Sequence, residues 1–289
     1  MSNIHPLTFG SLFAGIGGFD LGLERAGLHC EWQVEIDGYC RRVLAKHWPK
    51  VHRHDDVRTF PGVCNIAHLN DRCRDCGLRL RDRRPTEPCR RWRVDVICGG
   101  PPCQRTSVAA AIQGKRTGET LWPEMLRVVK AIGPRFVIIE QPGGNKAWET
   151  QVASDLAGAG YEATRLQRSA RGSGAPHRRR RVLFVAHAVR QRCEALAWQP
   201  ESSEAGTLAW PAPPRGAWRT SGSGDRGMDD GFSDWMDRLK GLGNAVVPDI
   251  AEGIGRRLMD AYTQEVKDRV VQNQILAYQD GSCIPPGAM

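Results

Sequence analysis

The sequence predicts an α/β fold built on a mostly parallel sheet with helices on both faces. Short apolar runs that read as buried strands alternate with segments of helical periodicity over the first two-thirds of the chain. Parallel strands need helix-length crossovers, and this alternation supplies them. The chain has 289 residues, of which 40% are hydrophobic. That is enough for one large α/β domain with a small accessory.

The elements follow one another in a regular order. We expect strands at residues 7–13, 30–37, 52–60, 94–100 and 135–144, and a strand that ends at residue 188. Helices are expected at 21–28, 38–49, 121–134 and 249–261, with a helix and then a strand within 149–169. The predicted organisation is a main α/β domain over 1–186 with an insert at 63–93, a short region of little periodicity over 187–242, a segment over 243–262 that ends in a helix, and a tail over 263–289.

The charge balance is basic. The net charge is +9, from 41 Lys and Arg against 32 Asp and Glu. This balance is a weak indication of a nucleic-acid partner, and ordinary surface solvation also explains it. No run approaches the roughly 20 apolar residues of a membrane span, and the N-terminus lacks the basic region of a signal peptide. We therefore expect a cytoplasmic protein without a membrane partner.

A glycine turn and two acids mark a cofactor site. AGIGG at 14–18 follows the first strand, and glycine permits the close backbone approach of a ligand. Glu35 and Asp56 follow the second and third strands, where they can accept hydrogen bonds from ribose hydroxyls and an adenine amino group. Without a phosphate-binding lysine, the pattern suits the adenosine of S-adenosylmethionine. A plain tight turn with solvated strand ends is the alternative.

GGPPCQ at 99–104 places a thiol at a strand end. The two prolines exclude helix and force an extended exit from the strand, so Cys103 lies in a loop at the carboxyl edge of the sheet. Ligands bind at this edge in open α/β folds. A thiol there is a candidate nucleophile once nearby cations favour its thiolate.

A cysteine cluster interrupts the sheet order at 63–93, a segment with nine arginines and four acidic residues. Its thiols are Cys64, Cys73, Cys76 and Cys89. Four thiols that include one CxxC pair fit a tetrahedral zinc site, and His68 could replace one ligand. A small arginine-rich segment would need such a metal to fold, and its charge suggests a grip on phosphate. A flexible insert with free thiols is the alternative.

Seven motifs, in order, make the chain resemble a DNA cytosine-5 methyltransferase of compact prokaryotic or phage type. They are FAGIGGFDLGLERAG at 13–27, VEID at 34–37, DV at 56–57, GGPPCQ at 99–104, VIIE at 137–140, HRRRRVLFVA at 177–186 and GNAVVP at 243–248. The resemblance spans most of the chain. It implies that 1–186 is the catalytic domain, that 187–242 is a short target-recognition region and that 243–262 returns to the catalytic domain. It implies a Rossmann-like S-adenosylmethionine-dependent methyltransferase fold and transfer of a methyl group to C5 of a flipped cytosine in double-stranded DNA.

The resemblance also implies residue roles. Cys103 would attack C6 of cytosine, and Glu140 would hold the N3 and amino edge and supply a proton. Arg179 would contact O2 and the thiolate region, and Arg181 would pair with Glu140 or position the loop. The residues implied to bind the cofactor are Phe13, Ala14, Gly15, Ile16, Gly17, Gly18, Glu35, Ile36, Asp56, Asn244 and Val246. The residues implied to contact DNA are Gln104, Arg105, Ser107, Lys115 and Arg116.

The chain departs from the family pattern in three motifs and in size. Gln141-Pro142 stands where the family has Asn-Val after the glutamate, His177 replaces a glutamine, and Arg105-Thr106 replaces Pro-Phe. The glutamine puts the structural hydrogen bonds of the family's asparagine in doubt. The recognition region over 187–242 is much shorter than in the family, and we hypothesise that the cysteine-rich insert partly replaces it.

Two other functions stay open at this point. The family's core motifs also occur in methyltransferases that act on tRNA cytosines, and the short recognition region favours that alternative. The altered motifs would also suit a catalytically silent nucleic-acid-binding module. Trp198, Trp210 and Trp218 could stack on bases or form local core. A monomer is expected, and a cognate restriction endonuclease is a conceivable partner.

Overall fold

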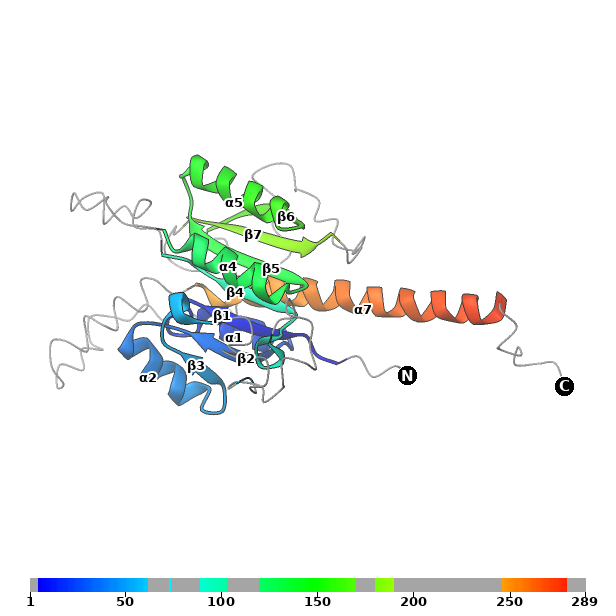
Figure 1. Cartoon of the computed structure of the whole chain (residues 1–289), viewed down its shortest axis with the longest axis horizontal. Helices are drawn as coiled ribbons and strands as arrows, with labels where there is room; N and C mark the ends of the chain where they lie inside the picture. Colours follow the sequence, from blue (N-terminus) through cyan, green and yellow to red (C-terminus); the bar gives the residue numbers. More distant parts are fainter. Residues whose placement is uncertain are drawn as a thin grey trace, which may run out of the picture.

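The structure is a computed structural model that describes residues 5–61, 73, 89–102, 120–169, 180–189 and 246–279. Its centre is a seven-stranded sheet in the order β3-β2-β1-β4-β5-β7-β6. Figure 1 shows this order running from β6 at the top to β3 at the bottom. The first five strands are parallel, and β7 lies antiparallel to both of its neighbours. The predicted mostly parallel α/β fold is confirmed.

Most strands agree with the sequence prediction to within a few residues, but the strand expected at 52–60 ends at His54 and is followed by a 3-10 turn. The strands are β1 (Thr8–Leu12), β2 (His29–Val34), β3 (His52–His54), β4 (Val96–Gly99), β5 (Phe136–Pro142), β6 (Tyr161–Ser169) and β7 (Arg180–Ala188). The helices are α1 (Gly18–Arg25), α2 (Gly38–His47), α4 (Trp122–Ile132), α5 (Lys146–Gly158) and α7 (Pro248–Gln279), with short 3-10 turns η1 (Val57–Thr59) and η3 (Arg90–Trp92).

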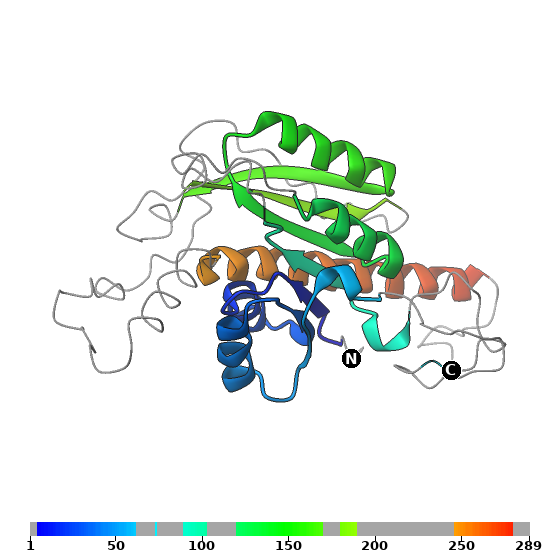
Figure 2. The ribbon, with the colours of Figure 1, turned by 60° about the vertical axis from the view of Figure 1, so that its left-hand side comes forward.

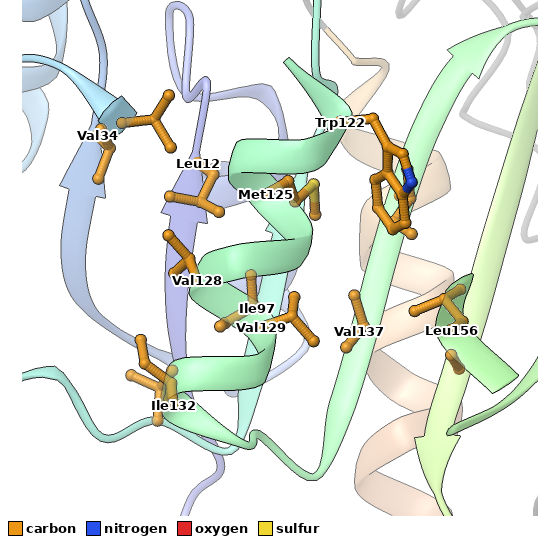
Figure 3. Close-up of a cluster of buried hydrophobic side chains, with 14 of the residues drawn as sticks. Leu12, Val34, Ile97, Trp122, Met125, Val128, Val129, Ile132, Val137 and Leu156 are labelled. Carbon is orange, nitrogen blue, oxygen red and sulfur yellow. The ribbon is translucent and has the colours of Figure 1, made fainter. Parts of the chain in front are cut away.

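One face of the sheet is covered by α4 and α5. Met125, Val128 and Val129 of α4 are fully buried against β-strand side chains, among them Ile97 and Val137 (Figure 3). Burial of side chains of this size stabilises the fold by roughly 1.5–3 kcal/mol each. The helix begins with Pro123 in its first turn and ends at Gly133, whose left-handed conformation (φ 62°) closes it.

The other face is covered by α1 and the first half of α7. Ile250, Ile254 and Leu258 are buried with Phe9 of β1 and Leu23 of α1. Their spacing of four residues keeps them on one side of the helix. The helix expected from residue 249 is therefore present, and its packing with α1 and β1 brings the last motif of the chain to the first.

The helix α7 is longer than the sequence analysis predicted. It runs to Gln279, so residues 263–279, expected as tail, are helical and extend past the sheet (Figures 1 and 2). No glycine or proline lies between Arg256 and Gln279, so no stop signal interrupts the helix. Arg135, before β5, anchors its middle through an ion pair of 2.5 Å with Glu265 and a cation–π contact with Tyr262.

Two thiols of the predicted zinc cluster are described, and both are buried. The Sγ atoms of Cys73 and Cys89 lie 3.9 Å apart, with exposed fractions of 2% and 0%. They pack in the same apolar cluster as Trp92 of η3 and Trp32 of β2. Within the described parts of the chain, no group of three or more metal-ligating residues is found. Cys64, Cys76 and His68 lie outside them.

The helices that the structure describes include no candidate membrane span. None of them is both long and apolar enough to cross a bilayer. The helix α7 is long enough, but acidic and basic residues recur along its length.

Candidate cofactor and catalytic site

The glycine turn leaves β1 at the carboxyl edge of the sheet. Phe13 has a positive φ of 54°, which is strained for a bulky residue, and Gly15 and Gly17 have φ values of 57° and 88°. The backbone N–H of Ala14 donates to the Val34 carbonyl at 3.1 Å, which ties the turn to the end of β2. The turn therefore holds a conformation that its glycines permit and its neighbours enforce.

Glu35 locks this turn. Its Oε2 accepts a hydrogen bond of 2.7 Å from the Gly15 backbone N–H, and its Oε1 accepts one of 2.8 Å from the Asp37 N–H. Each oxygen keeps a further lone pair that can accept a ribose hydroxyl. Among the described residues, nothing lies within 4 Å of the position of a Cβ on Gly15. The backbone of the turn is therefore open at Gly15, next to the Glu35 carboxylate.

Val246 closes on the turn from the far end of the chain. A Cβ added to Gly18 would meet the Val246 carbonyl oxygen well inside the 3.0 Å that real Cβ atoms keep. Glycine at position 18 is therefore required by the close approach of the segment that begins α7. The structure brings together the first and last motifs named in the sequence, residues 13–27 and the described part of 243–248.

Ile36 and Asp56 lie at the ends of the next two strands. Ile36 is 61% exposed, unusual for a large apolar side chain, and suits stacking against a flat aromatic ring. Both carboxylate oxygens of Asp56 are bound by the Arg58 guanidinium, with a shortest distance of 2.7 Å. These hydrogen bonds from Arg58 hold the pKa of Asp56 below its usual range. Asp56 also caps η1, so it has a structural contact that the sequence did not indicate.

Glu140 and Arg181 form a largely buried ion pair near the Cys103 loop. The Arg181 Nε contacts Glu140 Oε1, and the side chains are 20% and 8% exposed, respectively. The pair spans β5 and β7, whose antiparallel register sets Arg181 opposite Pro142. Glu140 Oε2 lies 3.2 Å from the position of a Cβ on Gly100, three residues before Cys103. The predicted pairing of Arg181 with Glu140 is present in the structure.

Two buried polar residues support the site from within the fold: Gln141, which the sequence marked as a departure from the family pattern, and Asp20, which the sequence analysis did not single out. Gln141 is 2% exposed and donates from Nε2 to the Pro101 carbonyl. Asp20 is fully buried and accepts from Ser11 Oγ at 3.0 Å and Gln33 Nε2 at 2.8 Å. An acid within the apolar helix start GFDLGL was a signal that could have found Asp20, whereas the departure from the family pattern had already drawn attention to Gln141.

The Asp20 network lies close to the glycine turn in the sequence. Burial raises the pKa of the Asp20 carboxyl to about 6, and the hydrogen bonds from Gln33 and Ser11 oppose that rise. Ser11 precedes the turn by three residues, and Gln33 precedes Glu35 by two residues. The network therefore joins β1, α1 and β2 close in sequence to the turn and to Glu35.

Several predicted site residues lie outside the described part of the chain. They are Cys103, Gln104, Arg105, Ser107, Lys115, Arg116, Arg179 and Asn244, together with Cys64 and Cys76 of the metal prediction. Trp198, Trp210 and Trp218 also lie outside it. The described structure reaches Pro102 before Cys103 and Arg180 after Arg179, so it fixes the strand ends that carry both residues.

The fold and this edge define the class of protein. The sheet has the order β3-β2-β1-β4-β5-β7-β6, with one strand antiparallel to its neighbours. At one edge of this sheet, the glycine turn is hydrogen-bonded to Glu35, and the Glu140 carboxylate lies beside Gly100, just after β4. Nothing in the described turn resembles a phosphate-binding loop with its lysine. The class is that of Rossmann-like α/β proteins that bind an adenosine without phosphates.

The chain belongs to the C-5 cytosine-specific DNA methylase family, whose model matches residues 7–71 and 78–209. The family resemblance inferred from the sequence motifs is therefore confirmed. With it, the fold is confirmed as the Rossmann-like S-adenosylmethionine-dependent methyltransferase fold.

Named relatives are similar over nearly two-thirds of the chain. The type II methyltransferase M1.HphI of Haemophilus parahaemolyticus is 29% identical over 62% of this chain and 45% of its own length. M.NgoPII of Neisseria gonorrhoeae is 28% identical over 64% of this chain and 50% of its own length. The solved structure of S. pombe Dnmt2 methyltransferase has a TM-score of 0.42 and 17% identity, over 64% of this chain and 50% of that one. This chain spans about half the length of the curated relatives it matches.

Proposed function

We propose that the chain is a DNA (cytosine-5) methyltransferase that transfers a methyl group from S-adenosylmethionine to C5 of a flipped cytosine through a covalent bond between Cys103 and C6. The observation that carries the proposal is the shared carboxyl edge. The Gly15–Glu35 contact borders the space for an adenosine, and the Glu140 carboxylate lies against Gly100 at the root of the Cys103 loop. A methyl donor and a nucleophile would thus approach one base from adjacent strand ends.

The residues present fit S-adenosylmethionine, which supplies the electrophilic methyl group. Glu35 would accept the ribose hydroxyls, Ile36 would stack on the adenine, and Asp56 would accept the adenine amino group. Gly15 to Gly18 and Phe13 would surround the methionine end, with Val246 and Asn244 closing over it. The open space at Gly15 and the 61% exposure of Ile36 support this assignment.

The proposed reaction conserves atoms and electrons. The Cys103 thiolate forms a bond to C6, which makes C5 nucleophilic, and C5 takes the methyl group as the donor's sulfur–methyl bond breaks. A base then removes the C5 proton, and the electron pair expels the Cys103 thiolate. Glu140, held by Arg181, would hold the N3 and amino edge of the base, and Arg179 would contact O2.

Double-stranded DNA is the proposed substrate, and the net charge of +9 supports a polyanionic partner. Gln104, Arg105, Ser107, Lys115 and Arg116, which follow Cys103 in the sequence, would contact the DNA. We place the protein in the cytoplasm of a prokaryotic cell as a monomer. The names of its relatives support a role in DNA modification, in which a restriction endonuclease could be a partner.

The test is bisulfite sequencing of DNA from cells that express the wild-type chain, Cys103→Ala or, as a matched control, Cys193→Ala. We expect methylated cytosines in one sequence context with the wild type and the control, and none with Cys103→Ala. In vitro, a duplex with 5-fluorocytosine should trap the wild-type chain, because fluorine at C5 cannot leave as a proton does. Trapping on a tRNA but not on a DNA duplex would instead establish the RNA methyltransferase, and no trapping on either would favour the silent module.

The cysteine-rich insert would hold a structural zinc ion. Four thiolates at about 2.3 Å from a tetrahedral zinc ion lie about 3.8 Å from one another, and Cys73 and Cys89 lie 3.9 Å apart. Cys64 and Cys76 would complete the site. Cys89 leads through η3 to the amino end of β4, the edge opposite Gly99, and this favours a folding role over direct base contact.

Metal analysis of the purified full chain tests this site. We expect about one zinc ion per chain in the wild type and in Cys40→Ser, a buried thiol of α2, and loss of zinc in Cys73→Ser. A wild-type chain that stays free of zinc after refolding with excess metal would contradict the site. If Cys73→Ser weakened DNA binding while the free energy of unfolding stayed unchanged, the insert would have a role in binding DNA phosphates.

A further inference from the structure

Few backbone groups are available to anchor the segment that leads to Cys103. The backbone pairing of β4 with β5 ends at Gly99 opposite Ile139. Pro101 and Pro102 follow, and proline has no N–H to donate. Their carbonyl oxygens are therefore the only backbone polar groups through which these two residues can be anchored.

Both carbonyls have partners, one on each side of the segment. The Pro101 carbonyl accepts from the Nε2 of Gln141, which extends the contact between β4 and β5 beyond the backbone ladder. The Pro102 carbonyl accepts from the Leu121 backbone N–H at 3.2 Å. Leu121 directly precedes α4, so this hydrogen bond joins the two ends of the stretch that contains Cys103.

Packing alone does not explain a glutamine at position 141. It is 2% exposed, and its Oε1 has no hydrogen-bond partner among the described residues. A buried amide with one unsatisfied acceptor costs free energy that an apolar residue of the same size would avoid. What the amide provides is the donor for Pro101.

We infer that Gln141 is a positioning residue, which sets the root of the Cys103 loop by holding the Pro101 carbonyl against β5. This deepens the proposed function and rests on it. Glu140 and Gln141 are consecutive in β5, so they point to opposite faces. Two consecutive residues of β5 would thus act in the reaction. Glu140 would contact the cytosine base, and Gln141 would hold the backbone that leads to Cys103. The glutamine at this position therefore keeps a structural hydrogen bond instead of losing one.

We expect loss of the Gln141 donor to slow the attack of the Cys103 thiolate on cytosine and to leave cofactor binding unchanged. A misplacement of about 1 Å at a reacting group can cost roughly 100-fold in rate. Gln141→Leu keeps the volume and removes the donor, so covalent trapping on a 5-fluorocytosine duplex should slow by about 10- to 100-fold. The dissociation constant for S-adenosylmethionine should stay within about 2-fold, because Glu35 and the glycine turn are untouched. Gln141→Asn keeps an amide one methylene shorter and should recover part of the rate.

The test combines this trapping rate with hydrogen exchange of the Leu121 amide, using the full chain. We expect Gln141→Leu to lower the protection of that amide and to slow trapping, whereas Gln151→Leu, on the exposed side of α5, should change neither. Unchanged Leu121 protection in Gln141→Leu, or an equal loss of cofactor affinity, would overturn the inference. If the wild type is never trapped but Leu121 protection still falls, the positioning role stands and the proposed function fails.

Discussion

Glu35 and the backbone N–H of Gly15 are joined by a hydrogen bond of 2.7 Å that ties the end of β2 to the glycine turn after β1. The contact fills one lone pair of Oε2, and Asp37 fills one of Oε1 at 2.8 Å. The carboxylate is thereby fixed at the edge of the sheet before any cofactor arrives. Preorganisation of this kind lowers the cost of ordering a binding site.

Glu35→Ala should therefore weaken S-adenosylmethionine binding in two ways. It removes the acceptor for the ribose and frees the turn, and we expect the dissociation constant to rise by about 100-fold, or roughly 2.7 kcal/mol. Titration calorimetry measures this directly. Glu31→Ala, at an exposed position of the same strand, is the matched control and should bind the cofactor as the wild type does.

Gly18→Ala should separate the first and last motifs. The new methyl group would overlap the Val246 carbonyl oxygen, and overpacking of this kind costs about 1–3 kcal/mol. Urea unfolding should show that loss, and cofactor affinity should fall with it because Val246 borders the site. Gly158→Ala, at the exposed end of α5 with open space around it, should be neutral or slightly stabilising. Equal stability of the two variants would contradict the close approach of Val246 to α1.

Asp20 should make stability depend on pH. The pKa of its carboxyl is about 6 in the folded chain against 3.8 for an unperturbed group, so the folded state binds more protons between these values. Stability should therefore be greatest at the acidic end of that interval and fall as the pH rises from about 4 to about 6, by up to roughly 3 kcal/mol. Asp20→Asn should lack this component of the profile.

Denaturant titrations at several pH values, on the wild type and Asp20→Asn, measure that difference. Asp260→Asn, which removes a charge from the exposed side of α7, should keep the wild-type profile over the same interval. A profile for Asp20→Asn that matches the wild type from pH 4 to pH 6 would show that Asp20 titrates normally.

Arg181→Met should destabilise the fold and slow the proposed reaction. Removing the arginine leaves the Glu140 carboxylate buried without its ion-pair partner, and a lost partner of this kind costs roughly 3 kcal/mol. The exposed ion pair of Arg256 with Glu252 on α7 offers the comparison. Arg256→Met should change the free energy of unfolding by less than about 1 kcal/mol. Similar losses in both variants would show that burial does not distinguish the two pairs.

The local sequence determined the elements and the identity of the site motifs. Short apolar runs predicted most of the described strands to within a few residues, because such runs bounded by glycine or proline are local signals. The strand expected at 52–60 was the exception, since β3 ends at His54. The placement of Glu35 at a strand end followed from the same reasoning, since parallel strands end at a common edge. The role expected for Glu140 came from the family resemblance. The helix from residue 249 was predicted, but its continuation to Gln279 was not, because exposed polar residues there were read as tail.

Only the tertiary structure decided which of these residues meet. Three contacts join residues that lie 20 or more positions apart in the sequence. They are the hydrogen bond between Gly15 and Glu35, the close approach of Val246 to Gly18, and the hydrogen bond from Gln141 to Pro101. Likewise, the burial of Asp20 depends on Gln33 and Ser11 arriving from two other strands. Residue type and spacing encode local conformation, whereas these contacts arise when strand order and register bring distant backbone and side-chain groups together. The sequence thus determined the fold and the candidate groups, and the packed sheet decided how each group is held.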